Sequence, residues 1–167
     1  MRNKVGFRAQ GLRNEGKLNS FPKGNLPLGM NCSHMRRQNH SLCILVVEDH
    51  TAVRRLTSYA LRNAGFEVLE ACTADEGATR IAEAEIDAII TDVEMPGTRN
   101  GYDLAWQAHA QRPAAPVLVV SESIEADRRD LPPQARFFDK PVDPWVLVAQ
   151  LHGALIASKR ERARSAA

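Results

Sequence analysis

The sequence predicts an α/β fold in which helices cover both faces of a five-stranded parallel sheet, in a (βα)5 order. Short runs that are apolar throughout recur along the chain, which is typical of strands buried on both faces. Amphipathic segments of helical period separate most of these runs, as expected for right-handed crossovers between parallel strands.

The five expected strands share a continuous apolar composition. The first is the clearest, because six consecutive apolar residues run from Leu42 to Val47 and two acidic residues follow them. In chain order, the expected strands cover residues 42–47, 66–71, 86–91, 116–121 and 135–138.

The first expected helix covers residues 51–64. Val53, Leu56 and Leu61 recur in it at helical spacing, which marks them as its inward face, and Gly65 follows as a C-terminal glycine. The next helices are expected over residues 75–84, with Thr73 as the cap, and over residues 101–111, where Arg112-Pro113 ends the pattern.

The last expected helix begins after Asp143 as its cap, with Pro144 in its first turn. Its inward stripe is Val148, Leu151 and Leu155. Between the fourth and fifth strands, the prolines of Leu131-Pro132-Pro133 leave room only for a turn or two of helix around residues 124–129.

Charge divides the chain into three parts. Residues 1–41 hold eight Lys and Arg against one Glu and show no periodicity, so we expect a disordered basic N-terminal extension. Residues 42–157, the expected domain, carry a net charge of −8, and residues 158–167 form a basic C-terminal tail of +3. The basic pI therefore comes from the two ends of the chain and does not indicate nucleic-acid binding. The acidic domain is better suited to bind a cation or a basic partner.

The chain is expected to be cytoplasmic, with no membrane partner. Its longest apolar run has six residues, whereas a membrane span needs about 20, and no apolar stretch follows the basic N-terminus as in a secretory signal. Cys32, Cys43 and Cys72 lack metal-ligand spacing, which favours free thiols in a reducing compartment.

Charged and polar side chains follow four of the expected strands. The first strand ends in Glu48-Asp49, the third in Asp92, the fourth in Ser121, and the fifth in Lys140. Because parallel strands place their carboxyl ends at one edge of the sheet, we expect these groups to lie together. Clustered carboxylates repel each other by about 4 kcal/mol per pair at an effective dielectric of 20, so they favour a hard cation such as Mg²⁺.

Four segments carry a family resemblance: LCILVVEDH, IITDVEMPGTRNG, VLVVS and FFDKP. In this order they resemble the CheY-like receiver domain of two-component response regulators, of the stand-alone type, over residues 42–156. The resemblance implies a flavodoxin-like fold, Mg²⁺ as the cofactor and Asp92 as the phosphoacceptor. It implies Glu48, Asp49, Asp92 and the main-chain carbonyl of Glu94 as metal ligands, Ser121 and Lys140 as phosphoryl-binding residues, and Ser121 and Phe137 as switch residues.

By the same resemblance, the phosphodonor is a sensor histidine kinase or a histidine phosphotransfer protein, and the chain is a phosphoacceptor rather than an enzyme. No glycine-rich nucleotide cradle occurs, which argues against ATP as the donor. About a dozen residues follow Leu155, so we expect no DNA-binding domain and an output through contact with an unknown protein target.

Two alternatives remain. A phosphorylation-independent pseudo-receiver would share the fold but not need the acidic cluster. A haloacid-dehalogenase-type phosphatase would need a second Asp two residues after Asp92, where this chain has Glu94.

Two features depart from the family pattern. Glu122 follows Ser121, where the family usually has a small residue, and its carboxylate should slow anionic small donors. The short segment before Lys140 reduces the helix that commonly relays the signal. Of the histidines, His50 follows the acidic pair, where a role at the edge of the site is the less favoured of two interpretations, while His109 and His152 are expected on exposed helix faces.

Overall fold

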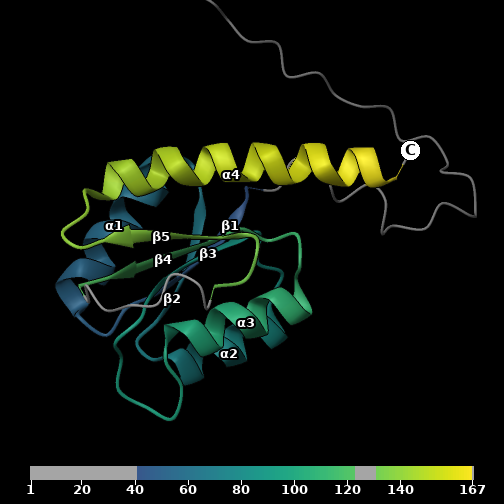
Figure 1. The fold of residues 1–167 in the computed structure, drawn as a ribbon. Coiled ribbons are helices and arrows are strands. Elements are labelled where there is room, and N and C mark those ends of the chain that lie inside the picture. Colours follow the sequence, from purple (N-terminus) through teal and green to yellow (C-terminus); the bar gives the residue numbers. More distant parts are fainter. Residues whose placement is uncertain (1–40, 123–130, 167) are drawn as a thin grey trace, which may run out of the picture. The chain divides into compact units, whose positions relative to one another are not determined.

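The computed structural model describes residues 41–122 and 131–166 (Figure 1). Five parallel strands form one sheet in the order β2-β1-β3-β4-β5, which confirms the predicted fold class. The expected helix at residues 124–129 and the basic extension up to residue 40 lie outside the described residues. The strands are β1 (Cys43–Val47), β2 (Glu67–Ala71), β3 (Ala88–Asp92), β4 (Val117–Ser121) and β5 (Ala135–Asp139).

Helices lie on both faces of this sheet, with α2 and α3 on one face and α4 on the other (Figure 1). Alternate residues of β1 point into two cores: Leu45 and Val47 pack in the cluster that includes α2 and α3, and Ile44 and Val46 in the one that includes α1 and α4. The helices are α1 (Thr51–Asn63), α2 (Ala74–Glu83), α3 (Gly101–Gln111) and α4 (Pro144–Ser165).

Side-chain caps fix the starts of three helices. Thr73 accepts a hydrogen bond from the Glu76 amide at 3.1 Å, and Asp143 accepts one from the Trp145 amide at 2.8 Å, as the sequence predicted. At α3, Asn100 forms a capping box that the sequence analysis missed. Since α3 follows the end of β3, this cap fixes the loop that leaves Asp92.

The inward face of α1 differs from the prediction. Leu61 is buried, but Val53 is 39% exposed and Leu56 is 57% exposed. The helix instead turns Thr57 and Ser58 toward the sheet, because these short side chains allow close packing. Val53 and Leu56 are thereby left beside the carboxyl edge of the sheet, where they line a cavity described below.

Helix α4 is longer than expected, because it runs on through the segment predicted as a basic tail. Its buried stripe contains the predicted Val148, Leu151 and Leu155, while the turns from Lys159 to Ser165 are fully helical and exposed. Among the described helices, none is both long enough and apolar enough to cross a membrane.

Candidate functional site

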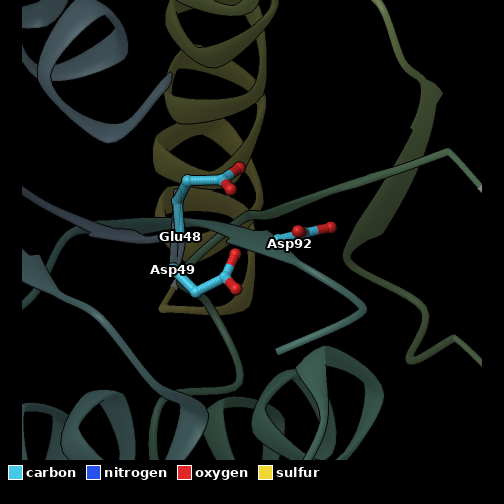
Figure 2. Close-up of side chains that lie close together, drawn as sticks. All are labelled: Glu48, Asp49 and Asp92. Carbon is cyan, nitrogen blue, oxygen red and sulfur yellow. The ribbon is translucent and has the colours of Figure 1, made fainter. Parts of the chain in front are cut away.

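Three carboxylates meet at the carboxyl edge of the sheet, as predicted. Glu48 and Asp49 follow β1, Asp92 ends β3, and these two strands are neighbours. One oxygen of each carboxylate lies within 4.8 Å of the others (Figure 2). Glu48 and Asp92 are buried, with 6% and 7% of their surface exposed, whereas Asp49 is exposed.

Lys140 supplies a positive charge between two of these groups. Its Nζ lies 2.9 Å from a carboxylate oxygen of Glu48 and 2.9 Å from one of Asp92. The main chain brings it there, because β5 pairs with β4 and the Lys140 amide donates to the Ser121 carbonyl at 2.8 Å. The Lys140–Pro141 peptide bond is cis.

The pKa values of this buried pair reflect both burial and charge. Burial raises the pKa of Glu48, the charge of Asp92 raises it further, and the hydrogen bond from Lys140 offsets only part of the rise. Burial alone would lower the pKa of Lys140, but its hydrogen bonds to Glu48 and Asp92 and their charges outweigh burial and raise it. Lys140 therefore stays protonated within the site.

Short contacts from the following loop hold Asp92 in place. Its Oδ1 accepts a hydrogen bond from the Val93 amide at 2.7 Å, and its Oδ2 faces Lys140. The start of α3 packs so closely that a Cβ at Gly101 would lie 1.9 Å from the Asp92 carbonyl oxygen. Only glycine allows this approach, which explains why glycine occupies the first position of α3.

A second anchor holds the same loop further on. Asp75, at the start of α2, accepts hydrogen bonds from the Thr98 amide at 2.9 Å and the Thr98 hydroxyl at 2.8 Å. These bonds, chiefly the one from the amide, lower the pKa of Asp75. The sequence analysis gave Asp75 no such part, because its partner lies on another element.

The remaining predicted site residues lie around this centre. Ser121 is buried at the end of β4, and Phe137 is half-buried against the core under α2 and α3, next to Val119 in the β4–β5 pairing. The Glu94 side chain is exposed in the loop after β3 and is not one of the three grouped carboxylates. Ser121 and Phe137 fall on the same face of the sheet, since residues two apart share a face.

A cavity of about 410 Å³ opens beside the carboxylates and is mostly apolar. Its lining includes Val53 and Leu56 of α1, Leu147 of α4, and the carboxylates Glu48 and Asp92. The exposed Glu122 also lines it. The sequence pattern did not predict this cavity, because helical spacing alone assigned Val53 and Leu56 to the core.

The histidines fit their predictions only in part. His50 is exposed next to the acidic pair, and its amide donates to Glu48 Oε1 at 3.2 Å. It is also the N-cap residue of α1. His152 is exposed as predicted, whereas His109 is half-buried, because its ring packs edge-on against Trp106.

A family model described as "Response regulator receiver domain" matches residues 44–152. This chain belongs to the response regulator receiver family. The match begins inside β1 and ends inside α4, so it contains all three grouped carboxylates and Lys140. Receiver domains generally bind Mg²⁺ at an acidic site and interact with histidine kinases or histidine phosphotransfer proteins.

Curated relatives of this receiver domain are longer proteins. The chain is 34% identical over 127 residues to "DNA-binding transcriptional regulator NtrC" of Bradyrhizobium sp. (strain RP501 Parasponia), covering 74% of this chain and 26% of that protein. It is 35% identical over 132 residues to "Sensory/regulatory protein RpfC" of Xanthomonas campestris pv. campestris, covering 75% of this chain and 18% of that protein. The chain thus spans about a quarter or less of these two relatives.

The match to solved receiver structures covers almost the full length of those structures. A CheY-like response regulator receiver domain protein from Methanospirillum hungatei JF-1 is 27% identical, with a TM-score of 0.66, covering 73% of this chain and 99% of that one. The receiver domain of the hybrid histidine kinase CckA is 34% identical, with a TM-score of 0.58, covering 68% of this chain and 98% of that one.

The donor set of this receiver domain fits Mg²⁺. All three side chains offer oxygen, and their spacing of up to 4.8 Å is close to the ~4.2 Å between opposite oxygens of an octahedral Mg²⁺ shell. With Lys140 charged, the three carboxylates leave a formal surplus of two negative charges, which one divalent cation neutralises.

Proposed function

We propose that this chain is a single-domain response regulator that receives a phosphoryl group on Asp92 from a sensor histidine kinase or a histidine phosphotransfer protein. The observation that carries the proposal is the grouping of a buried Asp92 with two further carboxylates and the Lys140 ammonium. Outside a cation or phosphoryl site, such a cluster of like charges would only destabilise the fold.

In this proposal a carboxylate oxygen of Asp92 attacks the phosphorus of a phosphohistidine. The new P–O bond forms as the P–N bond breaks, and the electron pair of the broken bond stays on the imidazole nitrogen. The Val93 amide donates to Oδ1, and Lys140 Nζ lies 2.9 Å from Oδ2, to which we assign the attack. Lys140 then turns from Glu48 and Asp92 toward the phosphoryl oxygens, and the Ser121 hydroxyl donates to one of them.

Glu48, Asp49, Asp92 and the main-chain carbonyl of Glu94 would hold Mg²⁺. Bound there, the cation would neutralise charge on the phosphoryl oxygens. We assign the conformational response to Ser121 and Phe137, which share one face of the sheet next to the site. The chain is then a phosphoacceptor that takes part in its own phosphorylation and dephosphorylation, not an enzyme acting on a separate substrate.

The phosphodonor is proposed to dock on α1. Val53, Leu56 and Tyr59 recur every three residues along α1 and all three are exposed, and Val53 and Leu56 also line the cavity beside the carboxylates. Exposed apolar residues next to a reacting carboxylate suit a protein donor better than a small anion. We place this exchange in the cytoplasm, and the output in contact with a further protein.

Labelling with a phosphodonor tests the proposal. The full chain, incubated with acetyl phosphate and Mg²⁺, should gain the mass of one phosphoryl group, and Asp92→Asn should gain none. A wild-type chain that takes no label from acetyl phosphate or from a panel of phosphorylated kinases would instead favour the pseudo-receiver, an interaction module that works without phosphorylation.

A further inference from the structure

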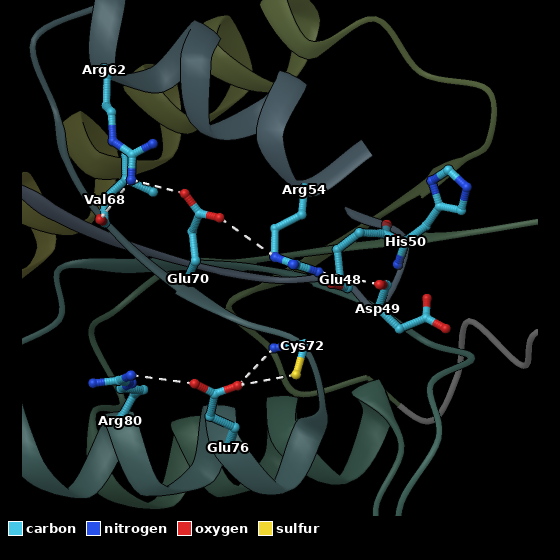
Figure 3. Close-up of polar contacts among 10 residues, drawn as sticks. All are labelled: Glu48, Asp49, His50, Arg54, Arg62, Val68, Glu70, Cys72, Glu76 and Arg80. Carbon is cyan, nitrogen blue, oxygen red and sulfur yellow. Dashed lines mark hydrogen bonds and ion pairs between the residues drawn. The ribbon is translucent and has the colours of Figure 1, made fainter. Parts of the chain in front are cut away.

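An arginine of α1 contacts the main chain of the acidic pair. Arg54 Nη1 donates to the Glu48 carbonyl at 2.6 Å and to the Asp49 carbonyl at 3.2 Å (Figure 3). Its side chain is only 15% exposed. Sequence patterns predicted a role for the two carboxylates but none for Arg54, which contacts their main-chain carbonyls.

A carboxylate of β2 holds this arginine in turn. Glu70 Oε2 lies 3.5 Å from Arg54 Nε, while its Oε1 accepts a hydrogen bond from Arg62 at 2.9 Å (Figure 3). Arg62 also donates to the Val68 carbonyl at 3.3 Å. The guanidinium of Arg54 is therefore fixed by Glu70 on one side and fixes the β1–α1 turn on the other.

We propose that Arg54 is a positioning residue, which holds the peptide groups of Glu48 and Asp49 so that both carboxylates face the cation site. This inference rests on the proposed function. Asp49 is exposed, so its carboxylate depends on the backbone for its position more than a packed side chain would. The main chain of this turn is tied at its ends, by Glu48 N to the Ala71 carbonyl and by Arg54 N to the His50 carbonyl. Arg54 ties the two peptide carbonyls between those points.

Positioning and charge predict opposite effects on Mg²⁺ binding. The positive charge of Arg54 repels a cation. If charge were its only role, removing Arg54 would tighten the binding of Mg²⁺. Loss of a positioning residue would weaken binding, and partners that orient metal ligands are commonly worth about tenfold or more in affinity. The sign of the change in Mg²⁺ affinity therefore distinguishes a positioning role from an effect of charge alone.

Calorimetric titration of the full chain with MgCl₂ tests the inference. We expect Arg54→Gln to bind Mg²⁺ about tenfold more weakly, and Arg54→Lys to recover part of the loss. The matched control is Arg55→Gln, which removes the same charge from the next, exposed residue of α1 and should leave the affinity unchanged or slightly tighter. Equal or tighter binding by Arg54→Gln would overturn the inference.

A second variant covers the case in which Arg54→Gln does not fold. Glu70→Gln keeps both arginines but removes the charge that fixes Arg54, and should weaken Mg²⁺ binding more than Glu67→Gln, an equal charge change on the same strand. Equal effects of the two would contradict the inference. If the wild-type chain binds no Mg²⁺, the proposed metal site itself is wrong, and this inference falls with it.

Discussion

Lys140 and Asp92 are joined by a contact of 2.9 Å between an ammonium and a buried carboxylate, at the ends of strands that are not neighbours in the sheet. In the cation-free domain, Lys140 thus supplies the positive charge that Asp92 and Glu48 need when buried.

Replacing Lys140 should destabilise the cation-free domain and make it depend on Mg²⁺. Lys140→Ala leaves Asp92 and Glu48 buried without a counter-charge, which should cost about 3 kcal/mol in the free energy of unfolding. Mg²⁺ should restore much of this loss. Urea unfolding in EDTA and in MgCl₂ measures both, with the exposed Lys159→Ala as control; equal losses in the two media would contradict the expectation.

Mg²⁺ should stabilise the wild-type domain, because it relieves repulsion among the three carboxylates. At ten times its dissociation constant, linkage gives about 1.4 kcal/mol. Asp49→Ala should abolish this gain, and its cation-free form should be no less stable than the wild type, since Asp49 is exposed and adds only repulsion. Thermal melts with and without Mg²⁺ measure the shift, and an unchanged midpoint in the wild type would count against the site.

Acid should remove the contribution of Asp75 to stability. Its pKa is lowered in the folded state, so the stabilisation is present above its unfolded pKa of about 3.9 and is lost as the pH falls through the folded value. Asp75→Asn should therefore unfold at lower urea than the wild type near pH 7, with the gap closing below about pH 4. The exposed Glu83→Gln is the control, and a gap that did not change with pH would refute this account.

Adding one methyl group at Gly101 should disrupt the site. The new Cβ would overlap the Asp92 carbonyl oxygen, so Gly101→Ala should cost about 3 kcal/mol and slow the labelling of Asp92. Gly153→Ala is the matched control: nothing lies within 4 Å of a Cβ there, inside α4, and the change should stabilise the domain by about 1 kcal/mol. Chemical denaturation of both variants would show whether the two signs are opposite.

Removing the carboxylate of Glu122 should speed the reaction with small donors. Glu122 is exposed and lines the cavity beside Asp92, so Glu122→Ala should raise the rate of labelling by acetyl phosphate about tenfold, or roughly 1.4 kcal/mol. The gain should shrink with added salt, which screens exposed charges over ~8–10 Å. A rate that stays unchanged at low salt would mean that the side chain points away from the path of the donor.

The sequence predicted those features that local patterns determine. The bounds of α3 were predicted correctly, because its apolar residues recur at helical spacing and Arg112-Pro113 ends the pattern. The three carboxylates and Lys140 were correctly predicted to lie at one edge of the sheet, because the carboxyl ends of parallel strands all lie at the same edge. Their distances and burial needed the three-dimensional structure.

The errors and omissions came from contacts that no local sequence pattern shows. Val53 and Leu56 have helical spacing but face a cavity, and α1 packs through Thr57 and Ser58. Arg54 was given no role, because no sequence pattern reveals a hydrogen bond from a side chain to a carbonyl across a turn.

Helix α4 is a single long helix whose two ends lie in different surroundings. It begins at Pro144, which lines the cavity beside Lys140, and its 22 residues span about 33 Å, roughly twice the length of the five-residue β5. A tilt of about 5° around Pro144 would therefore displace the far end by about 3 Å. That end carries Arg160 and Arg164, so such a tilt would move positive charge by about the length of a hydrogen bond.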